Sequence, residues 1–86
     1  MIKIDKNVSW TESENETVLI NPQNQKCIIL RETAKEIWEK IASLGNEKEV
    51  IRVLCEQYTS SNCKQIETDC LEFFIELEKN EFIKIC

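Results

Sequence analysis

Three short runs near the start of the chain predict β-strands, the first because apolar and polar side chains alternate in it and the other two because apolar and β-branched side chains are concentrated there. The runs cover residues 8–11, residues 17–20, which are rich in β-branched side chains, and residues 26–30. Polar stretches at residues 12–16 and 21–25 separate them and are typical of turns. Because both connections are short, the simplest topology is a three-stranded antiparallel meander.

From residue 32 onward the apolar positions recur three and four residues apart, which predicts helices. Within residues 32–44, the apolar side chains that share one helix face are Ala34, Ile37, Trp38, Ile41 and Leu44. Gly45, the only glycine of the chain, follows at the position of a left-handed C-cap. The pattern therefore predicts a first helix that ends at this glycine.

A second helix is expected to begin at Asn46, whose side chain can cap it, with Glu49 three residues later as in a capping box. Apolar side chains then recur at a spacing of four, at Val50, Leu54 and Tyr58. This spacing predicts a short helix with one buried face.

A polar break at residues 59–62 offers several N-cap side chains, and a third helix is predicted over residues 63–79. Its expected core stripe is Ile66, Cys70, Phe73 and Leu77. Asn80 tolerates the left-handed conformation and is expected to end the helix, after which Phe82 and Ile83 fold back on the core. The predicted order is β-β-β-α-α-α, an α+β fold with the whole chain, residues 1–86, as one domain.

The third helix carries apolar side chains outside its predicted core stripe. With Ile66 at 0° and about 100° per residue, Phe74 falls near ~80°, Leu71 near ~140° and Ile75 near ~180°. A surface helix is ordinarily polar at the last two positions. Either the helix has a wide buried face with scattered exposed apolar side chains, or it forms the wall of an apolar groove that binds a partner.

The third predicted strand offers the second half of such a groove. At the edge of a meander its free N–H and C=O groups can pair with an incoming extended peptide. Lys26 is its only charged residue, and residues 27–30 are apolar. The alternative is that a helix or the segment 82–85 covers this edge.

The amino-acid composition argues against several classes of function. The 86-residue chain has a net charge of −5 and no histidine. An acidic chain repels phosphate, which argues against a nucleic-acid partner. Without histidine the commonest general base and metal ligand are missing, and one glycine cannot build a phosphate-binding loop. We therefore expect no catalytic residue, no metal and no cofactor. No apolar run is long enough to span a membrane, so no membrane partner is expected.

The cysteines give no motif, because their number is odd and no C-x-x-C pair occurs. They lie at positions 27, 55, 63, 70 and 86. We expect free thiols in a reducing cytoplasm. Cys27, Cys55 and Cys70 fall within apolar patterns and are expected to act as small hydrophobic side chains.

With these features the chain resembles the PqqD-like family of leader-peptide recognition domains, over roughly residues 7–83. The resemblance rests on spaced motifs: Val8-x-Trp10 with the two following strands, Leu30-x-x-Thr33-Ala34-x-x-Ile37-Trp38, Val50-x3-Leu54-x3-Tyr58, and Ile66-x2-Asp69-Cys70-x2-Phe73-Phe74-x2-Leu77 before Phe82-Ile83. The chain departs from the family at Arg31, where a polar cap is frequent, so that Glu32 or Thr33 must help to cap the helix. It also departs at Glu81, where glycine is frequent.

The resemblance implies a winged-helix-like adaptor that is not an enzyme. Such a domain captures the leader of a ribosomally made precursor peptide as an added strand. It presents the precursor to a separate modifying enzyme, such as a radical SAM enzyme or a leader peptidase and cyclase. The leader would lie between the edge strand and the third helix, in contact with Lys26, Cys27, Ile28, Ile29, Leu30, Glu67, Leu71, Phe74, Ile75 and Glu78.

Two other functions stay open at this point. A winged-helix DNA-binding protein would use the third helix for recognition, but residues 63–79 hold two lysines against five carboxylates, which repel phosphate. A structural or oligomerisation module would pair the edge strand with itself across a two-fold axis and form a homodimer.

Overall fold

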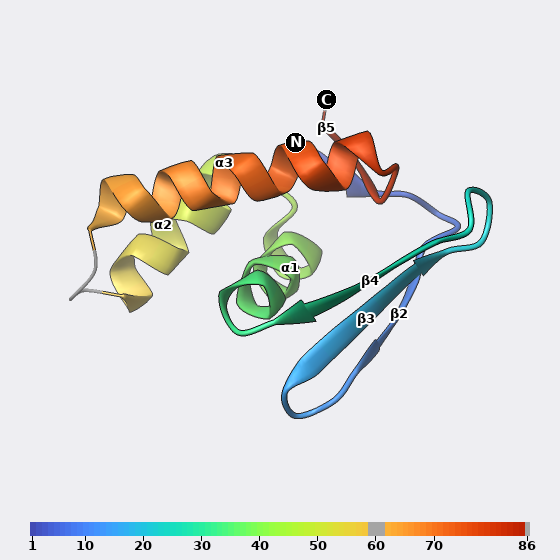
Figure 1. Cartoon of the computed structure of the whole chain (residues 1–86). Coiled ribbons are helices and arrows are strands. Elements are labelled where there is room, and N and C mark those ends of the chain that lie inside the picture. Colours follow the sequence, from blue (N-terminus) through green and yellow to red (C-terminus); the bar gives the residue numbers. More distant parts are fainter. Residues whose placement is uncertain (59–61, 86) are drawn as a thin grey trace.

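The computed structural model describes residues 1–58 and 62–85. A three-stranded sheet precedes three helices (Figure 1). The elements of this part are β2 (Ser9–Glu12), β3 (Glu16–Asn21), β4 (Lys26–Arg31), α1 (Thr33–Leu44), α2 (Glu47–Gln57) and α3 (Cys63–Lys79). The predicted α+β order of three strands and three helices is confirmed.

The sequence pattern does not predict β1 (Ile2–Ile4) and β5 (Ile83–Ile85), which pair antiparallel as a separate two-stranded ribbon. Each is the tripeptide Ile-Lys-Ile, which is too short to display a period of its own. The ribbon lies beside the C-terminal end of α3, so residues 83–85 pair with β1 and not with a strand of the sheet (Figure 1).

The sheet is antiparallel throughout, in the order β2-β3-β4. Leu19 of β3 and Leu30 of β4 are buried on its inner face, which α1 covers. On the outer face, Ile20 of β3 is 45% exposed and Ile29 of β4 is 53% exposed. The sheet therefore has one face in the core and one apolar face toward solvent.

The core forms where α1 meets the sheet and the other two helices. Trp38 is completely buried and meets Trp10 of β2 edge to face, with ring centroids 5.3 Å apart. Ile37 and Ile41 are buried as predicted. Leu44 was expected in this core and is 41% exposed. It lies in the last turn of α1, where the chain leaves the core at Gly45.

The predicted helix ends are confirmed in the described residues, except that Asn80 ends α3 with φ −93° and the left-handed conformation falls on Glu81, with φ 64°. Gly45 has φ 62°, and its N–H donates to Ile41 O at 2.9 Å. Asn46 Oδ1 accepts from Glu49 N at 3.2 Å. The reciprocal half of the capping box does not form, because the Glu49 carboxylate pairs with Arg52. Asn62 caps α3, and the other cap candidates, residues 59–61, lie outside the described residues.

The buried face of α3 is rotated from the predicted core stripe toward the side of Phe74. Cys70 and Leu77 are buried as expected, but Phe74 is buried with them, at 1% exposure. Phe73 and Ile66 are only partly buried. The reason is that α2 packs on the Phe74 side of α3, which shifts the centre of the buried face toward that residue.

Two asparagines of the β3–β4 hairpin bind the C-terminal end of α3. Asn21, which is 1% exposed, donates from Nδ2 to Glu81 O at 2.9 Å. Asn24 donates from Nδ2 to Asn80 O at 2.9 Å and to Glu81 Oε2 at 3.0 Å. We call these bonds the hairpin–helix contact. They fix the start of β4 against the end of α3, although the two segments are more than fifty residues apart.

Glu32 joins β4 to α1 in a conformation that favours glycine, with φ 53° and ψ −123°. It occupies the N-cap position, yet its side chain makes no capping hydrogen bond. The expectation that this side chain would help to cap the helix is therefore wrong. The backbone here is strained without compensation from the side chain.

Replacing Glu32 by glycine should stabilise the fold. Relief of the strain outweighs the added freedom of the unfolded chain, and we expect the free energy of unfolding to rise by about 1 kcal/mol. Urea denaturation followed by circular dichroism measures this. The control is Glu14→Gly, at an exposed turn position without positive φ, which should lose a few tenths of a kcal/mol, ~0.5. Equal losses in both variants would contradict the assignment of strain.

Candidate functional site

β4 is an open edge of the sheet. It ends the strand order, and in residues 1–58 and 62–85 no strand pairs with its outer side. The segment after α3 does not cover it, because β5 pairs with β1. Figure 1 shows β4 as the strand on the α3 side of the sheet. An extended peptide could therefore pair with its free backbone groups, between the sheet and α3.

The five predicted strand residues differ in what they offer a ligand. Leu30 is buried, and Ile28 is partly buried against the core. Lys26, Cys27 and Ile29 are exposed. Only these three present exposed side chains beside an added strand, and alternate residues of β4 point their backbone groups to the open edge.

One hollow lies beyond the end of β4, between the start of α1 and α3. It has a volume of about 380 Å³ and is lined by Thr33, Tyr58, Asn62, Gln65, Ile66 and Asp69. We call it the α1–α3 hollow. Thr33 follows the last residue of β4 by two positions, so a strand added to this edge would run toward the hollow. None of its lining residues was predicted as part of the site. Their sequence signal was the partly apolar flank of α3 at Ile66.

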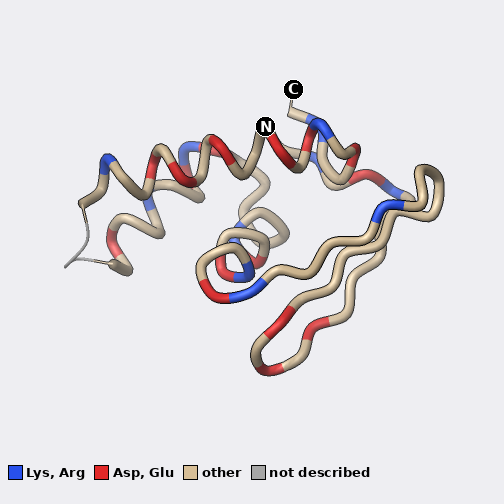
Figure 2. The backbone as a smooth tube through the Cα atoms, viewed as in Figure 1, with Lys and Arg blue, Asp and Glu red and all other residues tan. Residues whose placement is uncertain are grey.

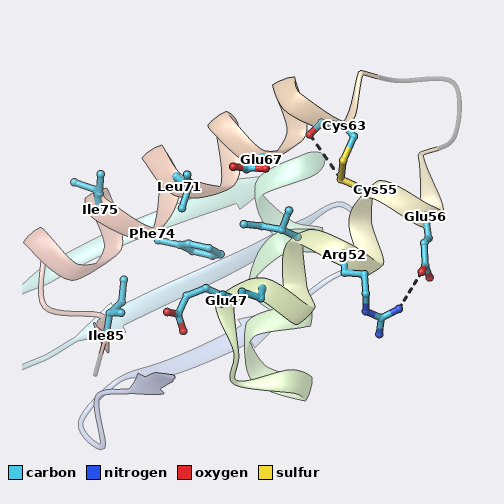
Figure 3. Close-up of a pocket in the computed structure, with 12 residues that line it drawn as sticks. Glu47, Arg52, Cys55, Glu56, Cys63, Glu67, Leu71, Phe74, Ile75 and Ile85 are labelled. Atoms are coloured by element: carbon cyan, nitrogen blue, oxygen red, sulfur yellow. Dashed lines mark hydrogen bonds and ion pairs between the residues drawn. A yellow bond between two sulfur atoms is a disulfide. The ribbon is translucent and has the colours of Figure 1, made fainter.

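A larger hollow of about 870 Å³ lies between α2 and α3 (Figure 3). We call it the α2–α3 hollow. Its lining consists of Glu47, Lys48, Ile51, Arg52, Cys55, Glu56, Cys63, Glu67, Leu71, Phe74, Ile75 and Ile85. Four predicted site residues of α3 belong to this set: Glu67, Leu71, Phe74 and Ile75.

The structure does not bring these helix residues together with the predicted strand residues. No residue of β4 lines the α2–α3 hollow. On α3, Leu71 and Ile75 point to the flank that faces α2, whereas Gln65 and Asp69 lie on the other flank and line the α1–α3 hollow. A helical wheel shows that Leu71 and Ile75 point away from the core stripe of α3, but it does not show which neighbouring element lies beside each flank of the helix. The binding role of either set stays a prediction.

The three apolar residues predicted to form the helix side of the groove, Leu71, Phe74 and Ile75, differ in their exposure to solvent. Leu71 is 44% exposed and Ile75 is 64% exposed, as expected for side chains outside the core. Phe74 is a core residue whose ring points from α3 toward α2 and forms the floor of the hollow (Figure 3). A ligand in this hollow would contact Leu71 and Ile75 first.

Glu78 has a structural contact. Its Oε2 atom accepts a hydrogen bond from the backbone N of Ile85 at 2.9 Å, which holds β5 against α3. It lines neither hollow. Glu67, by contrast, lies at the rim of the α2–α3 hollow and forms no ion pair with any residue that the structure describes.

Cys55 and Cys63 form a disulfide, which corrects the prediction of free thiols at these positions. The end of α2 and the start of α3 converge here, and the two Cα atoms lie 5.2 Å apart. The search for C-x-x-C pairs could not find this bond, because its partners are eight residues apart. Both cysteines line the α2–α3 hollow.

Among the described residues, two further cysteines are free. Cys27 is exposed on β4, and Cys70 is buried in α3. Burial, with a smaller effect of the Asp69 charge, raises the pKa of the Cys70 thiol to about 11. Cys70 therefore stays protonated at neutral pH and acts as a small hydrophobic side chain, as predicted. Cys86 lies outside the described residues.

Charge is distributed unevenly over the helices. Figure 2 shows acidic residues recurring along α3, which holds two lysines against five carboxylates. Such a helix repels a phosphate backbone. Within the described part of the chain, no three His, Cys, Asp or Glu side chains are grouped so as to hold a metal ion. No described helix is both long and apolar enough to cross a membrane.

The hairpin–helix contact positions the β4 edge, so its loss should be measurable. Asn21→Ala removes a buried donor from Glu81 O and an acceptor from Gln23 N. We expect the free energy of unfolding to fall by about 1–3 kcal/mol. In urea denaturation the midpoint should drop without a change in slope. The exposed Asn15→Ala serves as a control and should change stability by less than ~0.5 kcal/mol. A similar loss in both variants would contradict a special role for Asn21.

Comparison with known proteins supports this description of the fold. The family described as coenzyme PQQ synthesis protein D (PqqD) matches residues 16–83. A solved structure, TbiB1 in complex with the TbiA(beta) leader peptide, is similar to this chain, with a TM-score of 0.87 and 23% sequence identity. The match covers 95% of this chain and 94% of that chain, and at this identity it shows a shared fold. No curated protein matches the sequence.

Proposed function

We propose that this chain, which belongs to the PqqD family, is a non-catalytic adaptor that binds the leader of a precursor peptide by strand addition to β4. The observation that carries the proposal is the open β4 edge on the α3 side of the sheet. The solved structure of TbiB1, which has the same fold, contains a leader peptide. This supports the same ligand class here.

The physical basis of binding would be backbone pairing. An added strand satisfies N–H and C=O groups along residues 26–31, and each hydrogen bond contributes about 0.5–1.5 kcal/mol net. This part of the affinity depends little on the leader's sequence. Ordering a flexible leader offsets part of the gain, so we expect dissociation constants of about 1 µM or somewhat below.

Side-chain contacts would then set register and specificity. On the outer sheet face, Cys27 and Ile29 lie beside an added strand. At the end of the edge, a leader side chain could enter the α1–α3 hollow, against Ile66 and with Asp69 at its border. We assign this hollow to the leader because it adjoins the end of β4, which the α2–α3 hollow does not.

The adaptor would hold the leader while a separate enzyme modifies the rest of the precursor. A radical SAM enzyme and a leader peptidase with its cyclase are the two partner classes that we propose. Both need the precursor held at one end with the other end free, which strand addition at an edge provides.

Strand addition predicts a pattern that no other binding mode gives. Leaders of short peptides encoded beside this gene would be N-methylated one residue at a time, and their affinities measured by fluorescence anisotropy. In a strand only alternate residues point their N–H to the neighbouring strand. Methylation should therefore weaken binding at every second position, by about tenfold where a hydrogen bond is lost. A uniform effect along the peptide would contradict strand addition.

Two matched variants test, in the same assay, whether the leader binds at the β4 edge. Ile29 and Ile20 lie on the same outer face with similar exposure, but only Ile29 belongs to the edge strand. Ile29→Asp should lower the affinity for the leader several-fold, and Ile20→Asp should leave this affinity within about twofold of the wild-type value. An equal loss in both variants would argue against the β4 edge.

A further inference from the structure

One row of exposed side chains on α3 takes no part in the proposed leader site. Its members are spaced four residues apart: Glu67, Leu71, Ile75 and Lys79. Side chains four residues apart stand next to one another along a helix, and we call this row the α3 ridge. It shares no residue with β4 or with the lining of the α1–α3 hollow.

The middle of the α3 ridge is apolar. Leu71 is 44% exposed and Ile75 is 64% exposed, and both border the α2–α3 hollow. The floor of that hollow is apolar as well, formed by Ile51, Phe74 and Ile85 (Figure 3). The ridge and the floor together offer a partner an apolar surface that reaches from solvent to the core, and an exposed surface of this kind marks an interaction site.

The two ends of the α3 ridge carry opposite charges. Glu67 lies in the second turn of α3, and Lys79 is the last residue of the helix. Both side chains are exposed, and neither forms an ion pair with any residue that the structure describes. Read along the helix, the ridge is therefore acidic, apolar, apolar and basic.

The other carboxylates of α3 do not change this balance. At about 100° per residue, Asp69, Glu72 and Glu76 point about 80–140° away from the middle of the ridge. Asp69 lines the α1–α3 hollow on the opposite flank. The Glu78 carboxylate accepts the hydrogen bond that holds β5. The charge on the ridge itself is one acid and one base.

A row that is acidic at one end and basic at the other is complementary to its own reversed copy. A two-fold axis brings the same surface of two copies face to face, and an axis through the middle of the ridge sets the two α3 helices antiparallel. Positions 67 and 79 are equally far from that middle, as are positions 71 and 75. Glu67 of each copy then meets Lys79 of the other, and Leu71 meets Ile75. A parallel pair would place like charges together, which costs free energy.

We propose that the chain forms a two-fold symmetric dimer through the α3 ridge, in which two Glu67–Lys79 pairs flank the contacts between Leu71 and Ile75. The i, i+4 rows of the two helices lie side by side, as in the commonest class of helix packing. The β4 edge is outside this interface, so each copy keeps its own leader site and the dimer holds two leaders.

Sedimentation equilibrium of the intact chain, from about 1 µM to about 200 µM, should show a monomer and a dimer in exchange. Glu67→Lys places like charges opposite each other at both ends of the interface. It should raise the dissociation constant of the dimer about tenfold, and high salt should reduce this effect. Lys79→Glu should act in the same way. Glu14→Lys, at an exposed turn of the sheet, changes the net charge as Glu67→Lys does and should leave the constant within about twofold.

Mixing the two charge-reversed variants tests the pairing itself. In an equimolar mixture of Glu67→Lys and Lys79→Glu, every charge again meets its opposite across the interface. The heterodimer should therefore form with an affinity within about twofold of the wild-type value. The double variant Glu67→Lys/Lys79→Glu should likewise dimerise with itself. Damage to folding cannot produce this recovery, because both variants in the mixture keep their substitutions.

A further pair of variants tests the apolar part of the interface. Leu71 and Ile20 are 44% and 45% exposed, but Ile20 lies on the outer face of the sheet. Leu71→Arg should weaken the dimer at least about tenfold, because an unpaired charge replaces an apolar contact. Ile20→Arg should leave it unchanged. Leader affinity should be the same in Leu71→Arg as in the wild type, which separates this inference from the proposed function.

Four results would overturn the inference. The first is a wild-type chain that stays monomeric at the highest concentration, and the second is a mixture of the charge-reversed variants that dimerises no better than either alone. The third is an equal effect of Leu71→Arg and Ile20→Arg. The fourth is a dimer that an added leader peptide dissociates, since that result would place the contact at the β4 edge.

Discussion

The side chain of Asn21 connects the sheet to the end of α3 through one buried hydrogen bond to Glu81 O. A buried amide without this partner would cost free energy, so the bond fixes the position of the hairpin relative to the helix. Asn24 adds a second bond beside it. The start of β4 is thereby held at the C-terminal end of α3, while the end of β4 continues through Glu32 into α1. Both ends of the edge strand are thus fixed.

This constraint explains why the edge stays open. The ribbon of β1 and β5 takes the last strand of the chain away from the sheet, and the hairpin–helix contact keeps α3 beside β4 at one end. An open edge is ordinarily an aggregation hazard, and Lys26 and Arg31 place a positive charge at each end of this strand. The interior residues of β4, from Cys27 to Leu30, are apolar.

Much of this fold could be predicted because its helices and their ends depend on residues that are close together in the sequence. The helical spacing of Ile37, Trp38 and Ile41, the glycine at 45 and the cap at Asn46 each act within a few residues of chain. Long-range pairings could not be predicted in this way. The β1–β5 ribbon and the Cys55–Cys63 bond depend on how separate segments of the chain meet in space.

Local sequence patterns do not show which elements become neighbours, and this explains why the predicted groove between the edge strand and the third helix was not found as one surface. The wheel identified Leu71 and Ile75 as exposed apolar residues, which they are. It could not show that α2, and not β4, lies beside that flank. The strand and helix halves of the predicted site therefore lie on two separate surfaces.

Strand addition at β4 is tested most directly by amide exchange measured by NMR. Adding a leader peptide should slow exchange at alternate amides of residues 26–31, the spacing that pairing with a new strand produces. Protection confined to α2 and α3, with the β4 amides unchanged, would contradict it.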